Sequence, residues 1–381
     1  MRVSILGAGP AGLYAAILLK RRRPDIRVRL VEQNPSGATF GFGVVFSDQA
    51  LAFLEEDDRE TAALIEPAME RWCDIAVVHQ GERIAIDGVG FSAIGRLELL
   101  ALLRRRAVEL GIQPEYETRI DDLEALEPAD LVIGADGVHS RVRAAAPRAF
   151  GESLEYLDNR FVWYGAEREF DTLTQTFMDT RFGPMNAHHY RYAPGRSTFI
   201  IEMTPSVFDA TGFTDMAEPG YRAVCSECFA PTLEGARLVP NNSVWRRFPV
   251  LHCRRWYHGK CVLVGDALHT AHFSIGSGTR LAMEDVVALV RALETHDWDP
   301  AAAFPAYQAE REPILDKIVS AARRSADWYE HFDDHMKLPP WEFALSYIRR
   351  GGRVDADRLR QLAPGFCAEL GRRGVSLEQA A

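Results

Sequence analysis

Residues 2 to 19 read RVSILGAGPAGLYAAILL, and this stretch decides the fold of the first part of the chain. The apolar run Val3 to Leu6 predicts a buried strand, and the Ala- and Leu-rich run Leu13 to Lys20 predicts a helix. A glycine-rich hexapeptide separates the two runs. The order strand, tight turn, helix is the beginning of a βαβ unit that binds a dinucleotide.

Each glycine of the hexapeptide has its own task. Gly7 makes the turn, Gly9 lets the backbone approach a pyrophosphate, and Gly12 lets the helix pack close to the strand, with Ala11 in the same turn. A glycine turn that only packs is the alternative. However, Glu32 ends the next apolar strand, 20 residues after Gly12, where a carboxylate can accept hydrogen bonds from an unphosphorylated ribose. The context therefore favours a Rossmann-like dinucleotide site.

The composition bounds the rest of the chain. With 381 residues, of which 47% are hydrophobic and 26% charged, the chain is long enough for two cores and has the balance of a globular protein. A formal charge of -10 argues against nucleic acid as a general partner. Six cysteines are too sparse for a disulfide framework, and Cys225 and Cys228 lack the second pair that a zinc site needs. We expect reduced thiols, no metal and a cytoplasmic protein.

The apolar amino terminus imitates a secretory signal, but four glycine and proline residues interrupt it and no small-residue cleavage site follows. We expect it to stay on the mature protein. No apolar run in the sequence reaches the length of a membrane span, so we expect no membrane partner.

Two further buried strands end in an acid next to a glycine. Residues 130 to 143 read DLVIGADGVHSRVR, in which Asp136 follows the apolar run. The second run is Cys261 to Val264, followed by Gly265 and Asp266. Acids at the carboxyl ends of buried strands are typical of the crevice where an open α/β sheet binds its ligand.

A glycine-rich turn through Gly276 and Gly278 connects Asp266 to a helical run that ends near Leu289. The amino terminus of a helix has unpaired N–H groups and a partial positive charge. Such a turn can therefore hold something anionic.

The three motifs, in this order, resemble the single-component flavoprotein aromatic hydroxylases. The resemblance covers nearly the whole chain and implies that both acid-glycine segments belong to an FAD site. It implies that Asp266 holds the ribityl and pyrophosphate region and that the glycine turn lies beside the pyrimidine edge of the flavin. Arg96 matches a position that contacts the FAD chain, although a solvated arginine at a helix start is the alternative. Beyond the first turn, the residues so assigned to FAD are Arg96, Asp136, Gly265, Asp266, Gly276 and Gly278.

Within this family the chain departs from the common pattern, because Phe273 replaces a proline of the turn and Arg280 replaces an asparagine. Three segments resemble the salicylyl-CoA 5-hydroxylase branch, with the violacein-pathway hydroxylase as a more distant relative. These segments are FGFGVVFSDQAL at 40 to 51, RFVWYG at 160 to 165 and AHFSIGSGTRLAMED at 271 to 285. The substrate class follows from this likeness alone.

The middle of the chain has a different character. Between residues 151 and 251 the glycine motifs stop, and aromatic and β-branched runs predict an antiparallel sheet that covers the flavin. The runs are Phe161 to Tyr164, Thr172 to Met178, His188 to Tyr192 and Ser197 to Met203.

We predict an α/β protein: a Rossmann-like FAD-binding domain, a mixed or antiparallel β-sheet substrate domain and C-terminal helices. The FAD-binding domain is discontinuous, and a long helix with Ala306, Ile314, Ile318 and Ala322 closes it. The predicted boundaries are 1–72, 91–150 and 252–330 for the FAD-binding domain, 73–90 and 151–251 for the substrate-binding sheet, and 331–381 for a C-terminal helical segment.

The resemblance also implies a reaction. NADH or NADPH reduces FAD, molecular oxygen adds, and a C4a-hydroperoxyflavin delivers a hydroxyl group to an electron-rich ring. A thioester withdraws electrons from its ring, so a hydroxyl donor has to compensate, and the carbon para to the hydroxyl of salicylyl-CoA meets this need. The expected reaction is salicylyl-CoA to gentisyl-CoA, at C5.

Two side chains on a predicted strand are candidates for assisting the substrate hydroxyl. Strand alternation places His188 and Tyr190 on one face and His189 on the other. A histidine whose pKa lies near working pH can take up the proton, so His188 is the first candidate and Tyr190 the second. Packing or pairing within the sheet is the alternative for both.

Other polar residues have weaker signals. His269 and His272 could orient the cofactor or the substrate and do not look like metal ligands. Ser47 or Asp48 is interpreted as a helix cap. The arginine clusters 21–23 and 104–106 are candidates by charge for a coenzyme A arm, but such clusters are more often surface residues, and we assign none of them.

Two other functions stay open at this point. One is hydroxylation of a free aromatic or indole-derived substrate by the same chemistry. The other belongs to a different class: a non-oxygenating flavin reductase, or a flavin-binding subunit that presents reduced FAD to a partner.

Overall fold

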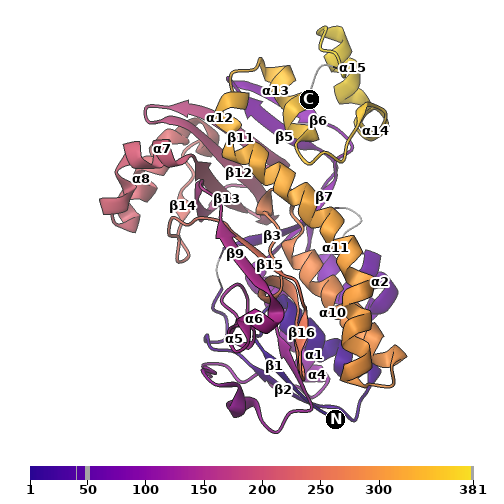
Figure 1. The fold of residues 1–381 in the computed structure, drawn as a ribbon. Helices are drawn as coiled ribbons and strands as arrows, with labels where there is room; N and C mark the ends of the chain where they lie inside the picture. Colours follow the sequence, from indigo (N-terminus) through magenta and orange to yellow (C-terminus); the bar gives the residue numbers. More distant parts are fainter. Residues whose placement is uncertain (40, 48–51, 379–381) are drawn as a thin grey trace.

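The computed structural model describes residues 1–39, 41–47 and 52–378. A five-stranded sheet forms its lower part in Figure 1, next to the N terminus, with strand order β16-β17-β8-β1-β2. Its strands are β1 (Arg2–Leu6), β2 (Arg27–Val31), β8 (Leu131–Gly134), β16 (Tyr257–His258) and β17 (Cys261–Leu263). All neighbours except β16 and β17 pair in parallel, so the predicted Rossmann-like sheet is confirmed.

Helices cover this sheet and bury its apolar residues. Helix α1 (Pro10–Arg22) packs against α4 (Arg96–Glu109) and α10 (Gly278–Thr295), and α10 packs against α11 (Pro300–Glu330). Pro10 and Pro300 stand in the first turns of α1 and α11, where a missing N–H costs nothing. Helix α11 is the predicted long helix, and on it Ile318 and Ala322 are buried, whereas Ile314 is 49% exposed.

The second large sheet has seven strands in the order β14-β10-β13-β12-β11-β5-β6. The predicted runs form β10 to β13 with antiparallel pairing, and β5 pairs with β11 in parallel, so the sheet is mixed. Its strands are β5 (Ile75–His79), β6 (Glu82–Ile86), β10 (Arg160–Ala166), β11 (Leu173–Thr180), β12 (Gly183–Ala193), β13 (Arg196–Met203) and β14 (Leu238–Val239).

Two smaller groups of strands lie between the large sheets. In Figure 1 the ribbon of β9 (Glu152–Tyr156) and β15 (Pro249–Cys253) runs from the second sheet toward the first. The other group has the order β3-β7-β4 and consists of β3 (Gly43–Ser47), β4 (Glu70–Trp72) and β7 (Phe91–Gly95).

Short helices fill the remaining surface. They are α2 (Ala52–Asp57), α3 (Arg59–Ile65), α5 (Arg141–Ala144), α6 (Pro147–Phe150), α7 (Pro205–Thr211), α8 (Glu218–Cys228) and α9 (Ala230–Leu233). Within the described ranges no helix combines the length and apolar character needed to cross a membrane.

The C-terminal segment is helical, as predicted, and the structure shows what it covers. Its helices pack with the end of α11 on strands β5 and β6, where Phe332, Phe343 and Phe366 join one buried apolar cluster with Ile84 and Ile86. The segment comprises α12 (Phe332–His335), α13 (Pro340–Arg349), α14 (Ala356–Leu362) and α15 (Pro364–Arg372). The division into domains at the predicted boundaries stays a prediction.

Candidate active site

The first glycine turn has the geometry that its sequence predicts. Gly7 has φ +100°, and a Cβ atom there would lie 2.4 Å from the Ala135 carbonyl oxygen. A Cβ atom on Gly12 would lie 1.8 Å from the Gly7 carbonyl oxygen, so no larger residue fits. Among the described residues, no atom beyond the chain neighbours lies within 4 Å of a Cβ atom placed on Gly9. The turn is therefore packed at both ends and open at the residue that was predicted to approach a pyrophosphate.

Glu32 lies at the edge of this turn in a fixed position. The backbone N–H of Ala8 donates to Glu32 Oε2 at 2.9 Å, and that of Asn34 donates to Oε1 at 2.9 Å. The carboxylate lines a pocket of about 400 Å³, together with Gly9, Arg96, Arg104 and Tyr116. This pocket lies where the sequence predicted the adenosine half of a dinucleotide.

The second motif connects to the third through a buried arginine. Asp136 follows β8 and accepts the backbone N–H of Arg141 at 2.6 Å, while its Oδ1 is buried without a partner. Burial raises the pKa of Asp136. Arg143, held at the start of α5, donates to the Ala267 carbonyl at 2.7 Å. The two acid-glycine segments are thus joined directly.

The turn after β17 packs against the first glycine turn. Gly265 has φ +60°, and a Cβ atom there would lie 2.9 Å from the side chain of Ala282 on α10 and 3.5 Å from that of Ala11. The small residue at position 11 is needed because α1, α10 and the turn meet there.

Asp285 on α10 holds this turn in place, and the sequence analysis did not predict a role for this residue. The buried carboxylate accepts the backbone N–H of Gly265 at 3.1 Å, contacts His269 Nε2 at 2.7 Å and accepts Arg311 Nε at 2.9 Å. Burial alone would raise the pKa of Asp285, but His269 and Arg311 hold it below its usual range. His269 therefore orients the turn, and its predicted role toward the cofactor or the substrate stays a prediction. An acid on a mostly buried helix was the only available signal for Asp285.

Asp266 and Arg96 face a common space. The side chain of Asp266 is accessible to solvent, yet the surrounding protein buries it enough to raise its pKa, which His269 and Arg96 oppose. Burial likewise lowers the pKa of Arg96, against the attraction of Asp266, and Arg96 Nε has no partner. The two properties together place both side chains on the wall of an opening inside the molecule. Arg96 is partly buried and lines the pocket beside Glu32, and its predicted contact with the FAD chain stays a prediction.

The glycine turn ends where α10 begins, as predicted. Gly276 has φ +61°, and a Cβ atom there would lie 2.9 Å from Val45 on β3. Helix α10 starts at Gly278 without a side-chain cap, and in the part of the chain that the structure describes no atom beyond the neighbouring residues lies within 4 Å of a Cβ placed on Gly278. Its first N–H groups are therefore available to an anionic or polar ligand.

These features fit a dinucleotide cofactor with a pyrophosphate. The open side at Gly9, the unpartnered Arg96 Nε and the uncapped helix start offer donors, and Glu32 and Asp266 offer acceptors for hydroxyl groups.

One face of the seven-stranded sheet carries buried polar atoms that have no partner among the described residues. The strand pairing places Gln175 opposite His188, and Asn186 opposite Glu202, all on the same face. The unpartnered atoms are Gln175 Nε2, Asn186 Oδ1, both ring nitrogens of His188, Glu202 Oε2 and, on α11, the hydroxyl of Tyr329. Buried polar groups are normally paired, so this polar face marks the position of a missing ligand or of ordered water.

The structure separates the two predicted assisting residues. Tyr190 is buried, and its hydroxyl donates to the Gly43 carbonyl at 2.9 Å. Burial raises the pKa of Tyr190. His188 has both nitrogens free, but burial, together with the charge of Arg350, lowers the pKa of His188 to about 3. The prediction that the pKa of His188 lies near working pH is wrong, because the ring is buried against a cation.

The C-terminal segment reaches the same region through Arg350, which the sequence analysis did not single out. Its Nη2 donates to the Ser274 carbonyl in the glycine turn at 2.9 Å, and its guanidinium lies 3.9 Å from the ring centre of Tyr347. His272 contacts Ser274 Oγ through Nδ1 at 2.8 Å, and burial lowers the pKa of His272 to about 3. The turn is thus fixed from both sides.

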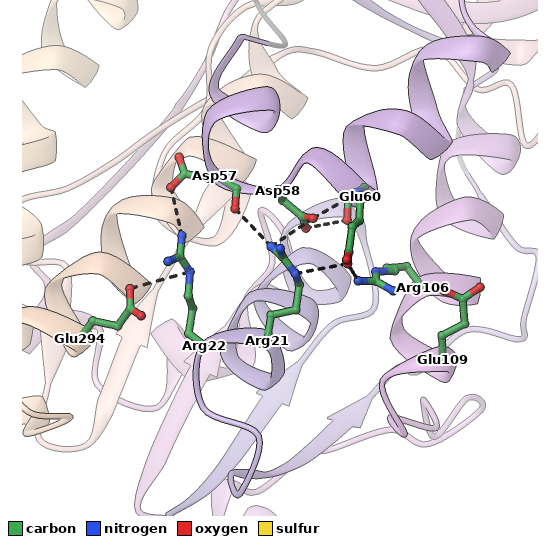
Figure 2. Close-up of polar contacts among 9 residues, drawn as sticks. Arg21, Arg22, Asp57, Asp58, Glu60, Arg106, Glu109 and Glu294 are labelled. Carbon is green, nitrogen blue, oxygen red and sulfur yellow. Dashed lines mark hydrogen bonds and ion pairs between the residues drawn. The ribbon is translucent and has the colours of Figure 1, made fainter.

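The first arginine cluster is used in surface ion pairs (Figure 2). Arg21 contacts Asp58 at 3.1 Å, and Arg22 contacts Asp57 at 3.5 Å. Arg106 of the second cluster pairs with Glu60. Arg22 also contacts Glu294 on α10 at 3.9 Å. These arginines connect α1 with α2, α3 and α10, and α4 with α3, which supports leaving them out of a coenzyme A site.

Two remaining expectations concern a cap and a metal. Ser47 ends strand β3, while Asp48 lies outside the described residues, so the helix-cap interpretation stays a prediction. In the part of the chain that the structure describes, no group of three or more His, Cys, Asp or Glu side chains is placed to hold a metal ion.

Comparisons with known proteins agree with this site. A family model described as an FAD binding domain matches residues 109–322, and one described as an NAD(P)-binding Rossmann-like domain matches residues 5–42. A salicyloyl-CoA 5-hydroxylase from a Streptomyces species is 38% identical over 92% of this chain and 70% of its own length. The chain belongs to the FAD-dependent aromatic monooxygenases of group A. The predicted enzyme class and cofactor are confirmed.

Two further relatives of this monooxygenase are also aromatic-ring monooxygenases by name. A 3-hydroxy-4-methyl-anthranilyl-[aryl-carrier protein] 5-monooxygenase from Streptosporangium sibiricum is 35% identical, over 93% of this chain and 95% of its own. The protodeoxyviolaceinate monooxygenase of Chromobacterium violaceum is 31% identical, over 92% and 94%. The predicted family resemblance is thereby confirmed. NAD(P)H is the cosubstrate typical of this family, and an aromatic molecule and oxygen are its other substrates.

The fold of this monooxygenase also has solved counterparts. The tetrameric form of 2-methyl-3-hydroxypyridine-5-carboxylic acid oxygenase superposes with a TM-score of 0.70 at 20% identity, over 92% of this chain and 97% of that chain. At this identity the similarity shows the fold alone. It confirms the α/β class with a Rossmann-like FAD-binding part, mixed sheets and C-terminal helices.

Proposed function

We propose that this monooxygenase hydroxylates an aromatic ring attached as a thioester, and that it converts salicylyl-CoA at C5 to gentisyl-CoA. The support comes from the 38% and 35% identical relatives, whose names place their substrates on coenzyme A and on an aryl-carrier protein. Because a thioester withdraws electrons from the ring, the ring needs a donor, and the salicyl hydroxyl activates the position para to it.

In this proposal FAD lies across the opening between the two sheets. Gly7, Gly9, Ala11 and Gly12 form the turn for the pyrophosphate, Glu32 accepts the ribose hydroxyls, and Arg96, Asp136, Gly265 and Asp266 surround the ribityl chain. Gly276 and Gly278 present the start of α10 to the flavin ring. When bound, FAD carries electrons from NADH or NADPH to oxygen, and the chain supplies a dry, ordered site for this chemistry.

His188 has the position to bind the substrate hydroxyl. The single observation that carries this assignment is that both of its nitrogens are buried and unpartnered on the polar face. With a pKa near 3 the ring is neutral at working pH and acts as a hydrogen-bond partner rather than as a strong base. Tyr190 supports the site through Gly43, because its hydroxyl proton is already used there.

Glu202 is the better candidate for taking up a proton. Its Oε2 has no partner, and burial raises the pKa of Glu202 to about 8, near the working pH of an enzyme. It stands diagonally across from His188 on neighbouring strands, about 7 Å away by strand geometry.

The test compares salicylyl-CoA with free salicylate under FAD, NADH or NADPH, and oxygen, with product identification by mass spectrometry. We expect gentisyl-CoA and coupled cosubstrate oxidation from the thioester. Product from the free acid alone would favour the second function, a hydroxylase of free aromatic or indole-derived substrates. Cosubstrate oxidation without any hydroxylated product would favour a flavin reductase or a flavin-binding subunit.

Matched variants connect this reaction to the site. Asp266→Ala is expected to lower FAD retention, because it removes the carboxylate that faces Arg96. His188→Ala is expected to retain FAD and to lower the rate of hydroxylation. A cytoplasmic location belongs to the same proposal and is supported by six cysteines that are all free thiols.

A further inference from the structure

A second pocket, of about 290 Å³, lies outside the site described above. Its lining residues are Arg148, Ala149, Arg254, Arg255, Tyr257 and Gln308. Three exposed arginines around one hollow are notable in a chain with a formal charge of -10. Among the residues with described positions, no carboxylate forms an ion pair with any of the three. They differ in this from the arginines of Figure 2, which acidic side chains neutralise.

The backbone holds these arginines together. The N–H of Arg255 donates to the Phe150 carbonyl at 2.9 Å and that of Arg254 to the Gly151 carbonyl at 3.3 Å, at the end of α6. Gly151 has φ +63°, and a Cβ atom there would lie 3.1 Å from Cβ of Arg254. The chain after β15 is therefore fixed against α6, which carries Arg148, and the positive charges converge from two elements.

An extended ribbon runs from the pocket to the glycine turn before α10. Phe248, just before β15, lies 4.8 Å from His272 and 5.9 Å from Phe273, measured between ring centres. Strand β15 ends at Cys253, and Arg254 follows it, six residues after Phe248 and about 20 Å away at the rise of an extended chain. In Figure 1, β15 and its partner β9 run along this path.

A coenzyme A thioester has a matching shape. Its pantetheine arm of about 14 bonds extends roughly 16 Å between the thioester and the phosphates, by the spacing of an extended covalent chain. Arginine binds phosphate oxygens in a bidentate manner, and three arginines suit a group with several phosphates. Tyr257 adds a partly buried ring to the same wall, against which an adenine can pack.

We propose that Arg148, Arg254 and Arg255 bind the phosphates of the nucleotide half of a coenzyme A thioester, whose arm follows the β9–β15 ribbon to the ring site. This inference rests on the proposed function, because it assigns the part of the substrate that the aromatic site does not hold. It also explains how the enzyme distinguishes the thioester from the free acid.

The experiment uses the FAD-loaded enzyme and adenosine 3′,5′-bisphosphate, the nucleotide end of coenzyme A, as a probe. We expect the probe to bind in calorimetry and to compete with salicylyl-CoA. Arg254→Glu and Arg148→Glu, which change residues on separate elements, are each expected to raise KM for salicylyl-CoA by about tenfold or more and to leave kcat unchanged. The expected rise in KM corresponds to the loss of one charge-assisted hydrogen bond. The same variants are expected to bind the probe correspondingly less tightly.

Arg27→Glu is the matched control, because Arg27 is exposed on β2, at the opposite edge of the first sheet. It carries the same change of charge and is expected to leave KM unchanged. Turnover of salicylyl-CoA without any binding of the probe would overturn the inference and leave the proposed function standing.

Two other outcomes separate the sources of the phosphate. A rise of KM for NADPH in place of KM for the thioester would assign the pocket to the nicotinamide nucleotide and overturn the inference. Arginine-dependent binding of the probe by an enzyme that hydroxylates only free acids would support the phosphate site and overturn the proposed function.

Discussion

Replacing Glu202 by glutamine tests the energetics of the polar face most directly. The side chain is 2% exposed, its Oε1 accepts Asn159 Nδ2 at 3.0 Å, and its Oε2 has no partner. Burial, reinforced by the nearby carboxylate of Glu330 and opposed by the Asn159 hydrogen bond, raises the pKa of Glu202 to about 8. Glutamine has the same shape and cannot ionise.

The size and sign of the effect follow from proton linkage. Raising the pKa from the ordinary 4.5 to about 8 corresponds to about 5 kcal/mol, at about 1.36 kcal/mol for each pH unit. The folded state favours the protonated carboxyl, so the contribution of Glu202 to stability is fully present below pH 4.5 and is lost as the pH rises through 8. The free energy of unfolding of the natural protein minus that of the glutamine variant is therefore expected to fall by about 5 kcal/mol between pH 4.5 and pH 9.

The assay is denaturant unfolding of both proteins between pH 5 and 9, at one fixed excess of FAD. Glu155→Gln, which changes an exposed carboxylate on β9, is the control and is expected to leave the pH dependence as it is. A difference between the natural protein and the Glu202→Gln variant that stays constant within about 1 kcal/mol over this range would refute the reasoning. It would mean that water or a rearranged side chain solvates the Oε2 atom.

The remaining predictions concern the other parts of the site. Gly12→Ala is expected to abolish FAD binding, because its Cβ would lie 1.8 Å from a backbone oxygen. Gly9→Ala is expected to fold normally and to weaken FAD binding. The fluorescence of bound FAD in matched samples measures both effects. His188→Ala is expected to retain FAD and to lower kcat by about tenfold or more, because a hydrogen bond to a reacting oxygen is lost. The dependence of the natural enzyme's rate on pH is expected to show no histidine ionisation between pH 5 and 8. An unchanged kcat of the variant would remove His188 from the mechanism. Asp285→Asn removes the fully buried one of the two carboxylates that pair with Arg311 and leaves only Glu284. It is expected to cost about 3 kcal/mol in unfolding free energy, measured by denaturant titration, and a loss smaller than about 1 kcal/mol would contradict the role of the pair.

The residues that the sequence predicted well are those whose constraint is local. Gly7 and Gly12 are required because backbone atoms lie too close for a Cβ atom, and Gly265 is required by its positive φ and by the nearby side chain of Ala282. The sequence pattern of a glycine turn indicates such requirements from a few neighbouring residues. Alternation along a strand, which put His188 and Tyr190 on one face, is local in the same sense.

The missed features depend on segments that are far apart in the chain. Asp285 acts through a turn 20 residues earlier and through Arg311, 26 residues later. Arg350 reaches Ser274 from the C-terminal segment, 76 residues away. The pKa of His188 was misjudged for the same reason, because its burial against Arg350 is created only when the C-terminal helices pack on the sheet.

The two neighbouring histidines of β12 show why the polar face is functional and does not merely reflect loose packing. His189, on the opposite face, contacts Thr176 Oγ1 through Nε2 at 2.9 Å and stacks on Phe199. His188, one residue earlier and equally buried, has no partner at either nitrogen. Each buried polar group without a partner costs about 1 to 3 kcal/mol, so a sequence selected only for stability would place an apolar side chain there. On the opposite face His189 Nδ1 and the Tyr164 hydroxyl also have no partner among the described residues, but His189 is paired through its other nitrogen. A substrate or water that pairs with His188 removes the cost at this residue. We therefore infer that a histidine is retained at position 188 because it binds an oxygen atom of the aromatic substrate.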